Sequence, residues 1–416
     1  MTPARPGYLL LEDGRRFDGV LCGAPPETWE RAGSRAGHAE TRAIPGGLPE
    51  APGRTAEVVF QTGMSGYQEV MTDPSYRSQI VVFTAPHIGN TGVNAADAEA
   101  RVPFFAGAVV RSLSERPSNR RSEWSLPAWL RRHRIPCLSE VDTRAVTRHL
   151  REAGALRGIL APAVLPEAEA LARARRFAGL AGRDLVREVA PPESEVRCPE
   201  TSSDDPLDAV FPAAAPSSRS PRITLVDCGA KEGIAACLRR RGARVRRVVP
   251  TISAEWLLRD APDAVWLSNG PGDPDTQPRL IETLRAILGR VPLFGICLGF
   301  QILALALGGR TRKMKHGHHG INHPVLELAS GRVLVTSQNH GFEVVADSLR
   351  SVRLGGGTYR VRPTYRSLND GTFEGFEIPE LDVAAVQFHP EARGGPHDGR
   401  RLFDRAPGFG GDLHAS

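Results

Sequence analysis

Lysine is nearly absent from this chain of 416 residues. Arginine supplies 50 of the 53 basic side chains, and the three lysines are Lys231, Lys313 and Lys315. Residues 1–220 carry as many acidic as basic side chains, so the whole net charge of +6 lies in residues 221–416. An excess this small, without a basic run longer than three residues, is not the pattern of a nucleic-acid surface. We therefore expect no nucleic-acid partner and attribute the arginine content to compositional bias.

Cysteine and long apolar runs are also scarce. The six cysteines include no Cys-x-x-Cys pair, which argues against a zinc site, and they are too sparse for a disulfide framework. The most apolar stretch, residues 292–307, is shorter than a membrane span and is interrupted by Gly295 and Gln301. The N-terminal residues lack the apolar core of a signal peptide. These absences predict a cytoplasmic protein with reduced thiols and no membrane partner.

Patterns that are present divide the chain into regions, and its length suggests two or three domains. Residues 1–190 are predicted to form a mixed α+β domain that begins with a hairpin at 7–22. Residues 23–56, rich in glycine, proline and alanine, are predicted to be a loop insertion. Residues 191–221, rich in proline, serine and aspartate, are predicted to be a linker. Strands are expected at 57–61, 80–84 and 105–110, and helices at 125–134, 142–153 and 166–177.

Residues 222–416 show short apolar runs that alternate with helical segments. This alternation predicts right-handed crossovers and a mainly parallel, doubly wound sheet, so the fold class is α/β. In such sheets ligands bind beyond the carboxyl ends of the strands. Strands are expected at 223–227, 244–249, 264–267, 293–296 and 384–388, and helices at 234–241, 254–259, 278–288 and 301–307.

A cysteine stands at one of these strand ends. The strand at 293–296 leads into Gly295-Ile296-Cys297-Leu298-Gly299, and a helical pattern follows. Gly-x-Cys-x-Gly at a strand-to-helix junction has the pattern of a nucleophile elbow. Glycine permits the sharp turn, the helix N-terminus favours the thiolate, and the Leu298 amide can face a developing oxyanion. A buried structural cysteine explains this local pattern equally well.

A base for this cysteine is suggested at another strand end. The strand at 384–388 is followed directly by His389-Pro390-Glu391, where a carboxylate can orient the imidazole. The loop Ser-Asn-Gly-Pro-Gly-Asp at 268–273 follows a third strand, and its amides can supply a second oxyanion donor. Taken alone, the His-Pro-Glu motif could be a surface turn, and the loop at 268–273 could be a simple tight turn. Their joint occurrence at strand ends of one sheet favours a site.

These motifs, in this order, resemble those of class I (triad) glutamine amidotransferases. Several N-terminal segments are similar to the small subunit of carbamoyl-phosphate synthetase, and they include Thr-Gly-Met-Ser-Gly-Tyr-Gln-Glu at 62–69, Thr-Asp-Pro-Ser-Tyr at 72–76 and Pro-His-Ile-Gly-Asn-Thr-Gly at 86–92. The segment Ser-Gln-Asn-His-Gly-Phe at 337–342 is also similar. The resemblance covers about residues 7–22 and 56–403.

The resemblance implies roles for individual residues. Cys297 is the expected nucleophile toward the side-chain amide of L-glutamine, and His389, oriented by Glu391, is the expected base and acid. The implied reaction releases ammonia through a γ-glutamyl thioester, and water then releases glutamate. The residues that would hold glutamine are Ser75, Gly270, Gly272, Leu298, Gln301, Asn339, Gly341 and Phe342. Because Ser75 comes from the first domain, the resemblance implies a site at the domain interface.

The chain contains no nucleotide-binding motif. It has no Gly-x-x-x-x-Gly-Lys-[Ser/Thr] loop, so no cofactor is expected in this chain. The resemblance implies that ATP and magnesium belong to a large synthetase subunit, which receives the ammonia and makes carbamoyl phosphate from bicarbonate. Residues 1–190 would then dock onto that subunit. Two alternatives remain open from the residues: a different Cys-His-Glu γ-glutamyl hydrolase, and a non-catalytic regulatory subunit.

Four histidines lie within a stretch of eight residues in the predicted second domain. Read alone, such a group can bind a metal ion. No cysteine or carboxylate accompanies it, and the segment is similar to one in the resembled family. We therefore expect a structural loop and no metal at His316, His318, His319 and His323.

Overall fold

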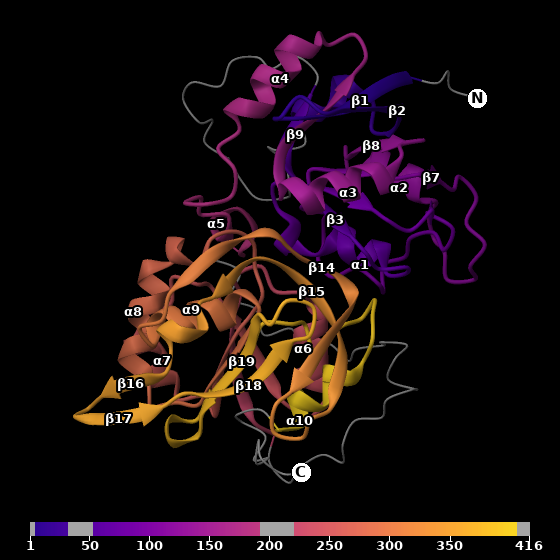
Figure 1. The fold of residues 1–416 in the computed structure, drawn as a ribbon. Helices are drawn as coiled ribbons and strands as arrows, with labels where there is room; N and C mark the ends of the chain where they lie inside the picture. The colour runs from indigo at the N-terminus through magenta and orange to yellow at the C-terminus, as the bar shows by residue number, and fades with distance from the viewer. Residues whose placement is uncertain (1–4, 32–52, 192–219, 406–416) are drawn as a thin grey trace. The chain divides into compact units, whose positions relative to one another are not determined.

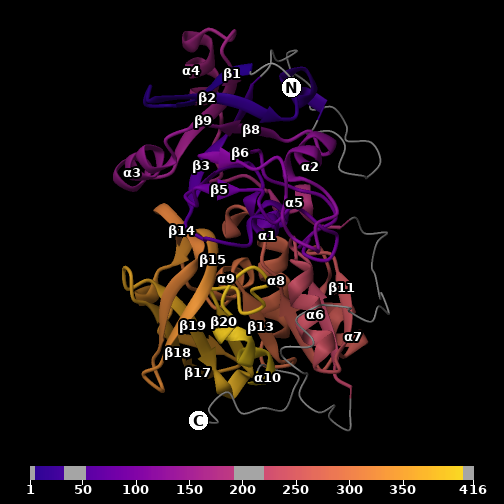
Figure 2. The ribbon, with the colours of Figure 1, turned by 90° about the vertical axis from the view of Figure 1, so that its right-hand side faces the viewer.

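The computed structural model describes residues 5–31, 53–191 and 220–405. The chain divides into two compact units (Figures 1 and 2). Unit 1 comprises residues up to Ala181 together with Lys315–His319, and unit 2 comprises Gly182–Met314 and residues from Gly320 onward. Most of the expected linker at 191–221 and the centre of the expected insertion at 23–56 lie outside the described residues.

Unit 1 is built on a closed barrel of seven strands in the order β1-β2-β8-β6-β4-β3-β9. Leu9 and Leu11 pack in one core cluster, whereas Tyr8 and Leu10 pack in another, as the period-2 alternation of a strand requires. The barrel strands are β1 (Arg5–Leu11), β2 (Arg16–Gly23), β3 (Arg54–Gln61), β4 (Gln79–Phe83), β6 (Gly107–Val109), β8 (Pro136–Ser139) and β9 (Leu156–Pro162).

Short helices pack against the barrel of unit 1. Helix α3 begins at a side-chain cap, in which Asp142 accepts a hydrogen bond from the amide of Ala145. A small parallel pair joins β5 (His87–Ile88) to β7 (Ser112–Leu113). The helices are α1 (Tyr67–Thr72), α2 (Leu126–Arg132), α3 (Thr143–Ala153) and α4 (Glu167–Arg176), and the 3-10 turns are η1 (Pro26–Arg31) and η2 (Pro74–Tyr76).

Unit 2 is built on a nine-stranded sheet in the order β11-β10-β12-β13-β20-β19-β18-β14-β15. The neighbours from β11 to β20 pair in parallel, and β20 pairs antiparallel with β19. The strands of the parallel part are β10 (Arg222–Val226), β11 (Arg244–Val248), β12 (Ala264–Leu267), β13 (Leu293–Ile296) and β20 (Val383–Val386). The apolar sequences of β10, β12, β13 and β20 suit strands that are buried on both faces, whereas the edge strand β11 carries three arginines and is partly exposed.

Helices cover both faces of the parallel strands. Val265 and Leu267 share a core cluster with residues of α7, α8 and α9, whereas Trp266 packs in a second cluster with residues of α6 and α10. Consecutive residues of β12 thus face opposite layers. These helices are α6 (Glu232–Arg240), α7 (Ala254–Asp260), α8 (Pro278–Ile287), α9 (Leu298–Ala306) and α10 (Leu402–Arg405), and the short α5 (Val186–Val189) also belongs to unit 2.

The rest of the sheet is antiparallel where its pairing is described, and it was not anticipated from the sequence. Its two longest strands, β14 and β15, are neighbours and appear as the long orange ribbons of Figure 1. The strands are β14 (Thr311–Glu327), β15 (Val333–Val344), β18 (Arg362–Ser367) and β19 (Phe373–Ile378), and β16 (Ser351–Leu354) pairs with β17 (Gly357–Arg360) as a separate hairpin. The remaining 3-10 turns are η5 (Pro274–Thr276), η6 (Ala346–Ser348), η7 (Pro379–Leu381) and η8 (Asp398–Arg401).

The described elements confirm the expected hairpin at 7–22. Every other expected strand and helix is matched by an observed one, whose ends differ by a few residues. One expectation about this region is wrong. The four histidines of 316–323 lie in strand β14 and not in a loop. In the described ranges, no helix is both long enough and apolar enough to cross a membrane.

Candidate active site

Cys297 occupies a strained backbone position between β13 and α9. Its φ of 55° and ψ of −103° are unfavourable for a side chain that carries a Cβ atom. Two glycines make this turn possible. A Cβ on Gly295 would lie 2.6 Å from the backbone of Gly299, and a Cβ on Gly299 would lie 2.5 Å from the carbonyl oxygen of Leu267. The spacing Gly-x-Cys-x-Gly is therefore required by packing.

Neighbouring strands hold the cysteine in place. The Cys297 amide donates a hydrogen bond of 2.9 Å to the carbonyl of Val386, the last residue of β20. The thiol lies 3.5 Å from the carbonyl oxygen of Asn339 on β15. Only 2% of the residue is exposed, so the sulfur is almost fully shielded from bulk water. Asn339, an expected substrate residue, thus lies beside the nucleophile.

His389 and Glu391 follow the end of β20 and contact each other directly. Nδ1 of the imidazole is 2.6 Å from Oε1 of Glu391, and both side chains are buried. The His389 amide donates to the carbonyl of Ser337, which fixes the backbone of the turn against β15. Nε2 of His389 is buried and has no hydrogen-bond partner among the described residues. The imidazole is therefore oriented through one nitrogen and keeps the other available.

Lys231, which the sequence did not single out, completes the buried group. Its ammonium lies 3.0 Å from Oε1 of Glu391, and the residue is 5% exposed. The backbone amide of Lys231 donates a hydrogen bond of 3.0 Å to Oδ1 of Asn269. Asn269 belongs to the Ser-Asn-Gly-Pro-Gly-Asp loop, so this loop also orients the lysine at the start of α6.

Charge sets the protonation of the His389–Glu391 pair. Burial alone lowers the pKa of His389, but the Glu391 carboxylate and Cys297 together outweigh burial and raise this pKa to about 10. Burial alone raises the pKa of Glu391, but the charges of Lys231 and His389 outweigh it and hold this pKa at about 2. At neutral pH the histidine is therefore protonated and the glutamate ionised.

The loop at 268–273 packs tightly against the start of α9. The Gly299 amide donates to the carbonyl of Ser268 at 3.1 Å. A Cβ on Gly270 would lie 2.4 Å from the carbonyl oxygen of Cys228, so only glycine fits there. Gly272 has a φ of +86°, which also favours glycine. Leu298, the first residue of α9, adjoins the loop, because the same Gly270 Cβ would also contact its side chain.

Three other expected substrate residues lie in unit 2. The Gln301 amide nitrogen donates to the carbonyl of Phe342 at 2.8 Å and to Oε1 of Gln387 at 2.9 Å. Gln301 is thus held by β15 and by the end of β20, and it fixes the position of Phe342. Gly341 is different, because no other described residue, apart from its chain neighbours, comes within 4 Å of a Cβ placed there. The protein itself does not require glycine at this position.

Ser75 belongs to unit 1 and is considered within that unit. It lies in η2, and its amide donates to Oδ1 of Asp73 at 2.9 Å. Ser75 is 7% exposed within a rigid Asp-Pro-Ser-Tyr turn. Seven of the eight expected substrate residues thus belong to unit 2 together with the expected catalytic residues, whereas Ser75 belongs to unit 1.

A buried cysteine, an oriented histidine and a carboxylate at the ends of parallel strands define a cysteine-dependent hydrolase or transferase. Residues 224–407 match the family model of class-I glutamine amidotransferases, and residues 41–160 match that of the carbamoyl-phosphate synthase small chain, CPSase domain.

Curated relatives match nearly the whole chain. Carbamoyl phosphate synthase small chains from Symbiobacterium thermophilum and Vibrio cholerae are 44% and 43% identical to it, over 95% and 96% of this chain and 96% and 97% of theirs. The small chain from Rhodopirellula baltica is 40% identical over 97% of this chain and 96% of its own length. The chain belongs to the carbamoyl phosphate synthase small chain family. Its second unit carries the amidotransferase domain of a glutamine-hydrolysing enzyme subunit.

Proposed function

We propose that the chain hydrolyses L-glutamine to glutamate and ammonia at Cys297 and delivers the ammonia to a large synthetase subunit. One observation carries the assignment of the site. His389 is held by Glu391 at 2.6 Å, and its second nitrogen is buried without a hydrogen-bond partner among the described residues. That arrangement suits an imidazole that exchanges a proton with the neighbouring thiol and with a leaving group.

The four buried charges support a thiolate as the nucleophile. The His389 imidazolium, the Glu391 carboxylate and the Lys231 ammonium carry one net positive charge in a region shielded from water, and in this proposal a thiolate at Cys297 neutralises it. A buried set of ions whose charges cancel is tolerated, whereas a buried ion without a counter-charge is strongly unfavourable. Lys231 would balance Glu391, so that the positive charge on His389 is left to pair with the thiolate.

The proposed reaction proceeds in two steps. The thiolate attacks the side-chain amide carbon of glutamine, and the imidazolium gives its proton to the departing ammonia, which leaves a γ-glutamyl thioester. The now neutral His389 takes a proton from water, hydroxide attacks the thioester, and glutamate leaves as the thiolate is restored. The Leu298 amide at the start of α9 and the loop at 268–273 would stabilise the two oxyanions. In this proposal the β13–α9 junction is a nucleophile elbow on a doubly wound sheet.

Glutamine would be held by residues on both sides of the nucleophile. The open space beside Gly341 suits a backbone that a ligand approaches closely. Gln301 would act by fixing Phe342, and Asn339 would present its backbone beside the thiol. Gly270, Gly272 and Leu298 would complete the pocket from the loop side, and Ser75 would contribute from unit 1. No metal ion is required for any of these steps.

The family implies a large subunit as partner, because the chain has no ATP-binding motif and ammonia is the reactive product. Ammonia that escapes to water is protonated and no longer nucleophilic, so direct transfer is the chemical reason for a complex. Unit 1, which lacks the Cys-His-Glu group, is the proposed docking module. ATP and magnesium would act on the large subunit.

Glutamate release should be measured for the wild type, Cys297→Ser and Cys237→Ser, each with and without a purified large subunit. The two variants make the same chemical change in the same unit, since Cys237 is a buried cysteine of α6. We expect Cys297→Ser to lose at least about a thousandfold in kcat, while Cys237→Ser retains turnover. Absence of glutamine turnover in the wild type under both conditions would refute the proposed reaction.

A further inference from the structure

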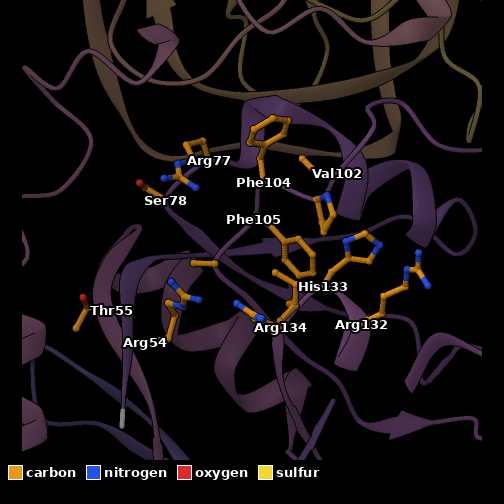
Figure 3. A pocket seen from close by; sticks show the side chains of 13 residues that line it. Arg54, Thr55, Arg77, Ser78, Val102, Phe104, Phe105, Arg132, His133 and Arg134 are labelled. Carbon is orange, nitrogen blue, oxygen red and sulfur yellow. The ribbon is translucent and has the colours of Figure 1, made fainter. Parts of the chain in front are cut away.

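Unit 1 contains a pocket of about 330 Å³ that the proposed glutaminase reaction does not use (Figure 3). Its walls come from the start of β3, the segment before β4, the loop before β6 and the turn between α2 and β8. Thirteen residues line it, and four of them are arginines, whereas none of these thirteen is acidic. The arginines are Arg54, Arg77, Arg132 and Arg134.

The arginines surround the pocket with permanent positive charge. A guanidinium stays protonated at every physiological pH, so this charge cannot be relieved by titration. Figure 3 shows Arg54 and Arg134 on one side of His133 and Arg132 on its other side. Burial, together with the charge of Arg132, lowers the pKa of His133, so the imidazole stays neutral at pH 7 and adds no charge. An anionic occupant would complement these guanidinium groups.

Apolar side chains form another wall. Phe104 and Phe105 line the pocket, and Phe105 is 2% exposed. Aromatic carbon next to a guanidinium excludes water and lowers the local dielectric constant, which strengthens an ion pair formed there. Arg54 is already anchored, since its Nη2 donates to the carbonyl of Trp29 at 3.0 Å. An anchored guanidinium loses less side-chain entropy when it binds a ligand.

Arg134 occupies a position where glycine is the usual residue. It follows α2 with a φ of 57°, and the amide of Ile135 donates to the carbonyl of Leu130 across this helix end. A left-handed backbone is unfavourable for arginine by about 1 kcal/mol relative to glycine. Ser78, which also lines the pocket, has a φ of 63°. Two strained residues that meet at one pocket are typical of a functional site.

From these features we propose that the pocket binds a small oxyanion with two or more negative charges, of the phosphate and polycarboxylate class. The planar guanidinium fork matches the oxygen pairs of both groups. The site belongs to unit 1 and is independent of the glutaminase chemistry of unit 2, so its occupancy is measured without any reference to glutamine turnover.

The test is calorimetric titration of the full chain with inorganic phosphate and with pyrophosphate. Sodium chloride is adjusted so that ionic strength stays constant, because screening alone otherwise changes the apparent affinity. We expect pyrophosphate to bind more tightly than phosphate, and chloride at equal ionic strength to produce no saturable heat.

Arg134→Gly is the decisive variant, because it removes the guanidinium and at the same time relieves the backbone strain. Thermal unfolding of the same variant shows whether it is folded, so that a loss of binding can be separated from misfolding. Arg131→Gln is the matched control: Arg131 is an exposed residue of α2 that does not line the pocket, and its replacement removes the same charge.

We expect Arg134→Gly to weaken pyrophosphate binding at least tenfold and Arg131→Gln to change it less than twofold. Equal losses of pyrophosphate affinity in the two variants would show that binding depends only on the net charge of the protein, and would overturn the proposal. Absence of saturable binding to the wild type would also overturn it.

Discussion

Cys297 in unit 2 and Arg134 in unit 1 hold nearly the same positive φ, 55° and 57°, although neither is glycine. Around Cys297 the turn is locked by packing, since a Cβ added to Gly295 or Gly299 would lie less than 3 Å from an adjacent backbone atom. Around Arg134 the turn is an ordinary helix end that glycine would form more easily. At both places the side chain, and not the backbone, explains why glycine is absent. In our proposals one side chain is the nucleophile of a buried site, and the other contributes charge to a pocket.

The largest effect is expected where the turn is locked. In Gly299→Ala the new Cβ would lie 2.5 Å from the Leu267 carbonyl oxygen, so β12 and α9 must separate. We expect a loss of about 4 kcal/mol in unfolding free energy, together with loss of glutaminase activity. Urea denaturation measures this.

Gly341→Ala is the control for that experiment, since a Cβ there meets nothing within 4 Å. Its unfolding free energy should stay within about 0.5 kcal/mol of the wild type, while KM for glutamine rises. Equal stabilities of the two alanine variants would show that the junction is not locked by packing.

Lys231→Met keeps the turn at Cys297 and removes one buried charge. Glu391 would then lack its cation at 3.0 Å, and a broken buried ion pair destabilises by about 3 kcal/mol. The double variant Lys231→Met with Glu391→Gln should recover most of this stability, because no unpaired ion remains. A double variant as unstable as the single one would contradict the pairing.

Glu391→Gln should change the pH dependence of both stability and activity. The pKa of His389 is raised to about 10, so its stabilising contribution is complete below about pH 6.5 and is lost as the pH rises toward 10. The pKa of Glu391 is lowered to about 2, so its contribution is complete above about pH 4.5 and is lost as the pH falls toward 2.

In the Gln variant both slopes should flatten, and kcat should fall about a hundredfold because the imidazole loses its orienting partner. Chemical denaturation and kcat profiles between pH 4 and pH 10 measure these two effects. A wild-type stability that rises from pH 6.5 to 10 would contradict the sign for His389.

The smallest expected effect, and the only gain, is at the other turn. Arg134→Gly should raise the unfolding free energy by up to about 1 kcal/mol, since relief of the left-handed strain exceeds the added entropy of the unfolded chain. Thermal unfolding measures this gain. A loss of stability would mean that the Arg134 side chain contributes packing, and the two turns would then be more alike than we infer.

Short-range patterns predicted the strand ends near which the three proposed catalytic residues lie. Cys297 and His389 each follow a strand-like run directly, and Glu391 comes two residues after His389, so their place at strand ends could be inferred from local sequence. Lys231 was missed, because it lies 160 positions before Glu391 in the chain. Only the folded sheet brings the two side chains together. The closed barrel of unit 1 was missed for the same reason, since its closure depends on the pairing of β1 with β9.

The long strands β14 and β15 were missed for a different reason. The first residues of β14, Thr-Arg-Lys-Met-Lys-His, carry polar side chains on both faces, so the usual alternation of apolar and polar residues is absent. The prediction of a loop at the histidines of this strand rested on family similarity and on the lack of an accompanying cysteine or carboxylate, neither of which reports on strand pairing. Tertiary pairing with β15 and β18 overrides the weak local signal.

The scarcity of lysine has a practical consequence for chemical labelling. Lys231 is buried against Glu391, whereas Lys313 and Lys315 are exposed on β14. A reagent that acylates amines will therefore mark the two lysines of β14 before it marks Lys231. Protection of those two lysines by a binding partner would report contact with a single strand. Modification of Lys231 would report that the interior of unit 2 had opened.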